Sequence, residues 1–234
     1  MGYPDMTGKS SGHAIVTGCS SGIGRAIADR LLGDGWRVTG ISRRDPGIDR
    51  EGFRHVAADL ENAESLQAAM RQVERCDALI HAAGVLRIGS IGEIDHGDGD
   101  RMWRLHVEAG ARLVQTLAPD MPDGGRIVFI GSRVATGAAG KAYYAASKAA
   151  LEGLARSFAA ELASRGITVN VIAPAATETP MLADPEREGL PPKLPPMGRF
   201  VQPDEIAALA AFLLCDEAAS ITGQRIVVCA GSSL

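Results

Sequence analysis

The chain is poor in aromatic residues and cysteines, and it contains no long hydrophobic run. Phe, Trp and Tyr make up 4% of its 234 residues, which disfavours a pocket that stacks rings on flat polycyclic substrates. No apolar stretch approaches the ~20 residues that cross a bilayer, and no signal peptide precedes the first predicted strand. A net charge of −4 provides no basic field for nucleic acid or anionic lipid. The four cysteines lack metal or disulfide spacing, so we expect a cytoplasmic protein with reduced thiols that binds neither nucleic acid nor membranes.

Short apolar runs alternate with helical patterns along almost the whole chain. Several of the apolar runs are continuous in Val, Ile and Leu, which is typical of parallel strands covered on both faces. The predicted strands are His13–Thr17, Arg37–Ile41, Arg54–Ala57, Ala78–His81, Arg126–Ile130, Thr168–Ile172 and Arg225–Cys229. The predicted helices are Gly22–Leu32, Ala63–Glu74, Asp98–Leu117, Tyr143–Ser164 and Pro203–Leu214. The pattern predicts an α/β fold: one doubly wound Rossmann-type domain whose seven-stranded parallel sheet, ordered 3-2-1-4-5-6-7, carries helices on both faces.

We expect residues 1–12 to be a flexible lead-in and residues 13–234 to be one catalytic domain. The one long irregular stretch, residues 177–200, contains six prolines and follows the sixth predicted strand at the carboxyl edge of the sheet. Loops of this length are usually functional lids or disordered. We therefore expect a substrate lid at about 177–200, with a plain spacer as the alternative.

A glycine-rich turn, Thr17-Gly18-Cys19-Ser20-Ser21-Gly22-Ile23-Gly24, follows the first predicted strand and opens the first helix. Gly18 permits a sharp turn, Gly22 lets the backbone approach a pyrophosphate, and Gly24 lets helix and strand pack closely. The helix N-terminus offers free N–H groups to phosphates. We therefore expect Gly18, Ser20, Ser21, Gly22, Ile23 and Gly24 to bind a dinucleotide.

The end of the second strand bears on the choice between NADP and NAD. An acid usually holds the 2′-hydroxyl of NAD here, whereas arginine accommodates the 2′-phosphate of NADP. Ser42 stands in the place of the acid and Arg43 follows it, which favours NADP(H) while leaving NAD(H) open. Alternatively, Arg43 is a solvated loop charge and Asp45 serves the ribose. After the third strand, Asp59 and Leu60 are placed to meet the adenine, although Asp59 is equally suited to cap the next helix.

Tyr144 and Lys148 lie four residues apart in a predicted helix, twelve residues after Ser132. Positions i and i+4 share one face of a helix, so the ammonium of Lys148 favours the phenolate of Tyr144, whose pKa is ordinarily about 10. A tyrosine tuned in this way moves a proton to or from a substrate oxygen near neutral pH. Tyr143 is the wrong choice of acid, because its i+4 residue is Ser147.

With these motifs assembled, residues 13–231 resemble the classical short-chain dehydrogenase/reductase family. The motifs that carry the resemblance are Thr17–Gly24, His81-Ala82-Ala83-Gly84, Ile130-Gly131-Ser132, Tyr144–Lys148, Val169-Asn170-Val171-Ile172-Ala173-Pro174, Thr179-Pro180-Met181, Gly198-Arg199-Phe200 and Ile221-Thr222-Gly223-Gln224. The resemblance implies an alcohol/ketone oxidoreductase that transfers hydride to or from a nicotinamide and requires no metal.

The resemblance also implies roles for single residues. Tyr144 is then the acid/base, Lys148 lowers its pKa and binds the nicotinamide ribose, and Ser132 bonds the substrate oxygen. Thr179 anchors the carboxamide of the nicotinamide. The remaining implied cofactor contacts are Ala82, Ala83, Gly84, Pro174, Ala175 and Thr177.

Several positions depart from the pattern of the family. His106 stands where the family has an Asn that supports a water-linked proton path to the lysine; proton relay and a structural role both remain open for it. His81 replaces the usual Asn of the fourth-strand motif, and Ala175 replaces a Gly. The spacing from Ser132 to Tyr144 is one residue shorter than usual. Only three residues follow Gly231, so we expect the tail to contribute little to a neighbour's pocket.

The favoured hypothesis is an NADP(H)-dependent dehydrogenase or ketoreductase that acts on a small-molecule alcohol or carbonyl. The alternatives are a catalytically silent NADP(H)-binding sensor and a scaffold subunit of a mixed oligomer. We also expect a homotetramer, or a homodimer, because family members pack the helices 98–117 and 143–164 against symmetry mates. Small residues of the second helix would permit close approach, although they are equally suited to packing on the sheet.

Overall fold

The computed structural model describes residues 12–183 and 193–234 of the chain. Its seven strands form one sheet in the order β3-β2-β1-β4-β5-β6-β7, and every neighbouring pair is parallel. The strands are β1 (His13–Thr17), β2 (Arg37–Ser42), β3 (Phe53–Ala57), β4 (Ala78–His81), β5 (Arg126–Ile130), β6 (Thr168–Pro174) and β7 (Arg225–Val228). The predicted doubly wound sheet and its strand order are confirmed.

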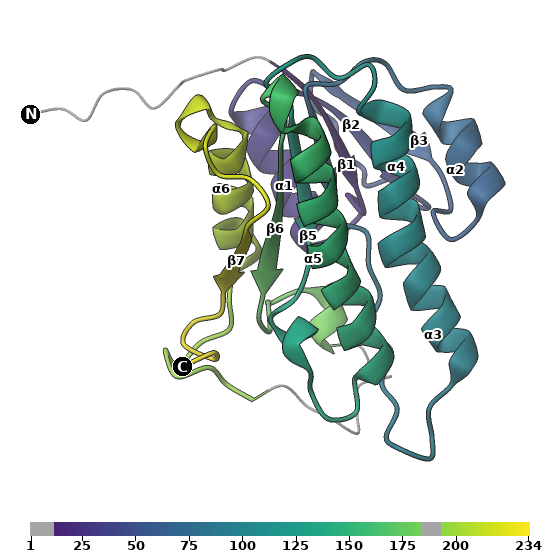
Figure 1. Ribbon diagram of the computed structural model, residues 1–234, viewed down its shortest axis with the longest axis vertical. Helices are drawn as coiled ribbons and strands as arrows, with labels where there is room; N and C mark the ends of the chain where they lie inside the picture. Colours follow the sequence, from purple (N-terminus) through teal and green to yellow (C-terminus); the bar gives the residue numbers. More distant parts are fainter. Residues whose placement is uncertain (1–11, 184–192) are drawn as a thin grey trace, which may run out of the picture.

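Helices cover both faces of the sheet (Figure 1). On one face lie α1 (Gly22–Gly33) and α6 (Pro203–Leu214), and on the other lie α2 (Ala63–Met70), α4 (Ala109–Leu117) and α5 (Ala142–Leu162). The helix α3 (His96–Trp103) precedes α4 and packs beside α5. Short 3-10 turns add η2 (Arg133–Thr136), η3 (Ala163–Arg165), η4 (Pro180–Ala183) and η6 (Asp216–Ala218).

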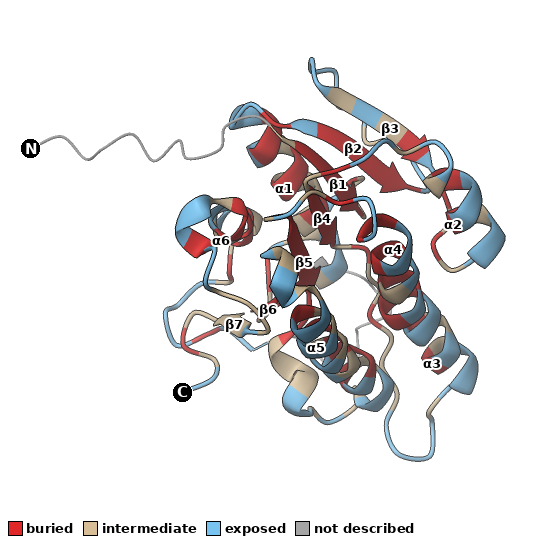
Figure 2. Cartoon of the chain, turned by 45° about the horizontal axis from the view of Figure 1, so that its top comes forward, coloured by how far each residue is buried: buried red, intermediate tan, exposed pale blue. Residues whose placement is uncertain are grey.

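Two hydrophobic cores lie on opposite sides of the sheet. Along β1, Ile15 joins the core under α4 and α5, whereas its neighbours Ala14 and Val16 join the core under α1 and α6. The central strands are buried throughout (Figure 2). Because successive strand residues point to opposite faces, a sheet covered on both sides buries every position. This explains the continuous apolar runs of the sequence.

The helix predicted over Asp98–Leu117 is not continuous. A π-helical turn, η1 (Arg104–Glu108), separates α3 from α4, and the N–H of Ala109 bonds to the carbonyl of Arg104. A π-turn inserts one extra residue into a helix and is frequent at functional sites. Here it contains His106, whose ring is fully buried. The prediction failed at this point because helical periodicity does not reveal a local insertion.

The predicted lead-in and the predicted lid are each described only in part. Residues 1–11 of the predicted lead-in and residues 184–192 of the predicted lid lie outside the described residues. Gly12 already belongs to the fold, since its carbonyl accepts the N–H of Arg37 at 2.9 Å. Among the described residues, no helix is long and apolar enough to cross a lipid bilayer.

Candidate active site

A cavity of about 710 Å³ opens at the carboxyl ends of the strands. In open parallel sheets ligands bind at this edge, where the order of the strands reverses. Ser132, Tyr144 and Lys148 line it, together with every residue predicted from the sequence to contact the cofactor. His106 does not line it. The cavity therefore unites motifs that lie up to about 160 residues apart in the chain.

The three glycines of the first turn are required for different reasons. Gly18 has φ +71°, and a Cβ there would lie 2.8 Å from the backbone of Ala83. A Cβ on Gly24 would lie 2.7 Å from the carbonyl carbon of Gly18. Gly22 has φ +56° and meets only the Thr179 side chain, at 3.2 Å. Gly18 thus lets the turn approach the backbone at Ala83, and Gly24 lets the helix approach Gly18. Gly22 leaves the turn without a side chain beside the cavity.

The N-terminus of α1 faces this cavity and lacks a side-chain cap. Ser21, the N-cap residue, makes no capping hydrogen bond, and the first turn carries no acidic residue. The first N–H groups of a helix have no intrahelical partners and attract anions. The low glycine surface and the uncapped helix end fit the pyrophosphate of a dinucleotide.

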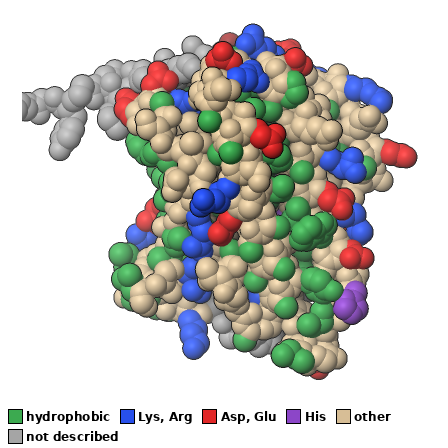
Figure 3. Space-filling model, viewed as in Figure 1, with side chains coloured by type: hydrophobic (Ala, Val, Ile, Leu, Met, Phe, Trp, Pro, Cys, Tyr) green, Lys and Arg blue, Asp and Glu red, His purple; other side chains and the backbone are tan. Residues whose placement is uncertain are grey.

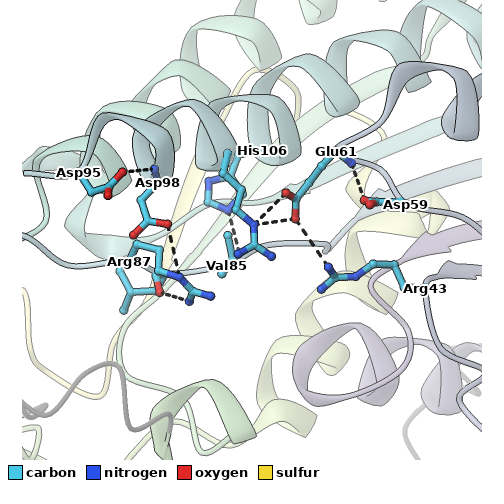
Figure 4. A network of polar contacts seen from close by, with 10 residues as sticks. Arg43, Asp59, Glu61, Val85, Arg87, Asp95, Asp98 and His106 are labelled. Carbon is cyan, nitrogen blue, oxygen red and sulfur yellow. Dashed lines mark hydrogen bonds and ion pairs between the residues drawn. The ribbon is translucent and has the colours of Figure 1, made fainter.

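The end of the cavity beside β2 and β3 carries both positively and negatively charged side chains. Arg43, Arg44 and Glu61 line it, and Figure 4 shows Arg43 pointing toward Glu61. Glu61 accepts two hydrogen bonds from Arg101 Nε, at 2.8 and 3.0 Å, and lies 3.9 Å from the Nη1 of Arg43. Arg43 is 62% exposed, so its guanidinium is accessible to an incoming phosphate.

The alternative roles considered for Asp45 and Asp59 do not agree with the geometry, whereas the exposed Arg43 also fits a solvated loop charge. Asp45 does not line the cavity, and its carboxylate accepts the N–H of Gly47 in a local turn. Asn62, not Asp59, caps α2 by accepting the N–H of Ser65 at 2.9 Å. Asp59 instead lines the cavity and accepts the N–H of Glu61. The Ser42 hydroxyl donates to the carbonyl of Arg44 at 2.7 Å, which helps to fix the loop after β2.

At the other end of the cavity, Ser132 and the first turns of α5 place three polar groups together. Tyr144 and Lys148 share one face of α5, and the Lys148 Nζ lies 5.8 Å from the centroid of the Tyr144 ring. Lys148 donates to the carbonyl of Ile130 at 2.9 Å, which ties α5 to the end of β5. Ser132 follows β5 and accepts the N–H of Val134 at 3.3 Å. Tyr143, by contrast, bonds His96 at 2.6 Å outside this cavity.

Lys148 is buried, with 4% of its surface exposed, and this burial lowers its pKa from 10.5 to about 7. A buried ammonium loses its hydration, and this desolvation is the cause of the shift. The amine is therefore poised to exchange a proton near neutral pH. Groups tuned in this way cluster at functional sites.

His106 occupies the π-turn behind Lys148 and is completely buried. Its Nε2 accepts the N–H of Val85 at 3.0 Å, and its Nδ1 lies 2.9 Å from the hydroxyl of Ser147. Its ring packs edge-on against Tyr144, with 5.8 Å between the ring centroids. His106 thus contacts the helix that carries the tyrosine but not the cavity itself.

Sequence reasoning missed part of the cavity wall. The C-terminal residues Gly231, Ser232 and Leu234 line this chain's own cavity, beside Leu194 of the predicted lid. Gly231 has φ +88° and packs against Pro196, while Ala230 accepts the N–H of Met197. The only signal for this arrangement is Gly231 itself. No sequence pattern links three terminal residues to a distant loop.

The arrangement of turn, cavity and polar groups matches known proteins. A profile described as enoyl-(acyl carrier protein) reductase matches residues 18–233. The chain belongs to the short-chain dehydrogenase/reductase family. It is 37% identical to the 3-oxoacyl-[acyl-carrier-protein] reductase FabG of Salmonella typhimurium over 93% of this chain and 96% of that protein. It is 35% identical to the D-threitol dehydrogenase of Mycolicibacterium smegmatis, over 94% of this chain and 92% of that protein.

Among solved structures, a blue fluorescent protein from a metagenomic library in complex with NADPH superposes with a TM-score of 0.87. It is 32% identical and matches 98% of this chain and 100% of that chain. Short-chain dehydrogenases/reductases are oxidoreductases, and this chain matches the family profile over residues 18–233. Membership of the family accounts for the cavity at the carboxyl edge of the sheet.

Proposed function

We propose that the protein is an NADP(H)-dependent oxidoreductase that interconverts a secondary alcohol and a ketone, with Tyr144 as the acid/base. The observation that carries this proposal is the placement of Tyr144, Ser132 and the buried Lys148 around one cavity. A bound nicotinamide would supply or accept the hydride. The names of the relatives support the substrate class, because a 3-oxoacyl group contains a ketone and threitol contains secondary alcohols.

In this proposal each polar side chain performs one task on the substrate oxygen. Tyr144 donates its phenolic proton to the oxygen in reduction and takes it back in oxidation. Ser132 donates a hydrogen bond to the same oxygen and so stabilises the charge that develops there. Lys148, which exchanges its own proton near neutral pH, favours the phenolate of Tyr144 through its charged form.

The preference for NADP(H) is supported by the charges beside the second strand. Arg43 and Arg44 line the cavity, and Arg43 is exposed and only loosely paired with Glu61. A 2′-phosphate gains from an accessible guanidinium at this position, whereas Ser42 stands at the end of the second strand where an acid would hold a free 2′-hydroxyl. The NADPH complex of the metagenomic relative agrees with this preference.

Steady-state kinetics on purified protein test the proposal. With NADPH and a panel of 3-oxoacyl thioesters and simple ketones, we expect turnover that NADH supports less efficiently. Tyr144→Phe should lower kcat by about 100-fold or more without weakening NADPH binding, which is measured by fluorescence titration. Tyr143→Phe is the matched control and should keep wild-type turnover, because Tyr143 lies outside the cavity.

Two results would contradict the proposal. The first is tight NADPH binding without turnover of any substrate in the panel, which would favour the silent sensor or the scaffold subunit. The second is a Tyr144→Phe variant with undiminished kcat. Either result would remove Tyr144 from the role of acid/base.

We further propose that the chain forms a homotetramer through the face that carries α3 and α5. Ala146, Ala149 and Gly153 are exposed along α5, and a Cβ on Gly153 would meet no atom within 4 Å. Trp103 on α3 is 44% exposed, and hydrophobic side chains are spread over the same face (Figure 3). Of the small residues Ala145, Ala146, Ala149, Ala150 and Gly153 in α5, only Ala145 is buried in the domain.

A further inference from the structure

Two fully buried histidines flank Lys148 without lining the cavity. His81 ends β4, and His106 lies in the π-turn η1. Gly84 packs between the second histidine and the lysine: a Cβ there would lie 3.2 Å from the His106 Nε2 and 3.4 Å from the Lys148 Nζ. Because His106 lies this near a lysine that titrates, a role as a proton relay has to be considered. Its hydrogen bonds decide whether it has that role.

The partners of His106 leave it one neutral tautomer. A backbone N–H can only donate, so the Nε2 that accepts from Val85 carries no proton. The proton of the neutral ring is then on Nδ1 and is donated to the Ser147 hydroxyl at 2.9 Å. Ser147 in turn donates to the carbonyl of Tyr144 at 2.9 Å. This series of donors runs in one direction and ends at a backbone oxygen that has no proton to pass on.

His81 is held in the opposite tautomer by the same logic. The carbonyl of Leu105 in the π-turn can only accept, so the His81 Nε2, 3.1 Å away, carries the proton. Its Nδ1 then accepts from the Thr17 hydroxyl at 2.9 Å. The Thr17 oxygen accepts the N–H groups of Ala82 and Ala83, both at 3.1 Å, so its hydroxyl proton is directed at the ring.

A second proton on either ring is electrostatically unfavourable. On His106 it would point an N–H at the N–H of Val85, and on His81 it would point an N–H at the donating hydroxyl of Thr17. Burial, with a smaller contribution from the charge of Lys148, lowers the pKa of His81 to about 4. Burial, Lys148 and His81 together keep the pKa of His106 well below 6.5. Within the described residues, the hydrogen-bond partners of the two rings are Thr17, Leu105, Val85 and Ser147, and none of these partners is a carboxylate that would offset the effects.

We propose that His106 and His81 are positioning residues, each locked in one neutral tautomer, and that no proton passes through His106 during turnover. His106 joins the segment after β4, through Val85, to α5, through Ser147. His81 joins the end of β4 to the π-turn. Together they hold the first turns of α5 against the loop that bears Gly84. The part of this proposal that concerns turnover rests on the oxidoreductase function proposed above.

The tautomers are tested directly by nuclear magnetic resonance of wild-type protein whose histidine rings are labelled with ¹⁵N. The signals are assigned through their connections to the backbone. We expect His106 to be protonated on Nδ1 alone, and His81 on Nε2 alone, between about pH 5.5 and 9. An Nε2-protonated His106, or one that titrates near pH 7, overturns the proposal. This measurement needs neither turnover nor a variant.

Kinetics with three variants separate positioning from relay. Asn and Gln cannot titrate, but each amide preserves one of the two hydrogen bonds of His106. His106→Asn and His106→Gln should therefore keep kcat within about tenfold of wild type, since one hydrogen bond is at stake, and leave the pH profile of kcat unchanged. His106→Leu should lower kcat further, and added imidazole should not restore it.

The opposite pattern identifies a relay. In that case both amide variants lose kcat by about 100-fold or more, the pH profile shifts, and free imidazole restores turnover of the His106→Leu variant. If wild-type protein turns over no substrate, the proposed function fails while the resonance measurement still decides the tautomers. The two failures are therefore distinguishable.

Discussion

Lys148 occupies a position that is costly for a charged side chain. Its ammonium is buried, and its hydrogen bond to the carbonyl of Ile130 replaces only part of the water that it gives up. The resulting pKa of about 7 lies below that of the unfolded chain. In the range between these two values the unfolded chain binds a proton that the folded chain does not. The free energy of unfolding therefore rises with pH across this range.

We predict that Lys148→Met removes this pH dependence. The wild-type free energy of unfolding should rise between pH 7 and pH 9, and the variant should show a flatter profile and be more stable at pH 7. The gain at pH 7 is on the order of a few kcal/mol, because each unit of pKa shift corresponds to about 1.4 kcal/mol. Urea unfolding at the two pH values measures it.

The exposed Lys193 provides the matched control. Lys193→Met should retain the wild-type slope of unfolding free energy against pH. Identical slopes in the wild type and in Lys148→Met would show that Lys148 stays protonated in the folded protein.

At the residue scale, the sequence predicted which side chains act together only where they lie close together in the chain. Tyr144 and Lys148 are one helical turn apart, so helix geometry alone predicts their shared face. The state of His106 was left open because its partners, Val85 and Ser147, lie 21 and 41 residues away. A tautomer is set by the groups that face the ring, and only the fold brings these groups together.

At the scale of elements, one close contact between α3 and α5 joins the ring of Tyr143 to Gly99. The ring of Tyr143 lies directly over Gly99, where a Cβ would approach its Cδ2 to 2.6 Å. The Tyr143 hydroxyl bonds His96 at the start of α3, and the two rings pack edge to face. Gly99 weakens α3 locally, but it lets α3 and α5 approach closely.

We predict that Gly99→Ala destabilises the protein although alanine favours helix. The methyl group collides with the Tyr143 ring, and overpacking of this kind costs about 1–3 kcal/mol, against a helix-propensity gain of about 1 kcal/mol. The net loss in the free energy of unfolding is measured by urea denaturation.

A double-mutant cycle isolates this contact. With Tyr143→Ala in the background the ring is gone, and Gly99→Ala should then be neutral or stabilising. If the substitution costs the same in both backgrounds, the Tyr143 ring is not what Gly99 accommodates.

The order of the elements was readable from the sequence, whereas their interruptions were not. Continuous apolar runs and the turns between them predicted all seven strands and their arrangement. The π-turn Arg104–Glu108 left no mark on the hydrophobic pattern, because its buried residues continue the stripe of α4. Nothing about Gly99 in the sequence indicates a tyrosine 44 residues later.

At the scale of the whole molecule, the exposed stripe on α5 makes a prediction about assembly. If α5 packs against a symmetry mate, Ala149→Arg places a long charged side chain where backbones approach, and the assembly should dissociate. Light scattering coupled to size-exclusion chromatography measures the mass. Wild type should have about four times the mass of the chain, and the variant a smaller multiple.

Ala68→Arg tests the same substitution on a different exposed helix. Ala68 lies on α2, away from the α3–α5 face, so this variant should keep the wild-type mass. A wild-type protein that elutes as a monomer would refute the assembly.

The C-terminal residues have a practical consequence for handling the protein. Because Ser232 and Leu234 form part of the cavity wall, a purification tag fused after Leu234 would emerge at the mouth of the cavity and compete with small molecules for entry. The strand β1, by contrast, starts at the amino ends of the strands, whereas the cavity lies at their carboxyl ends. Binding data from a form tagged after Leu234 should therefore not be pooled with data from a form without that tag.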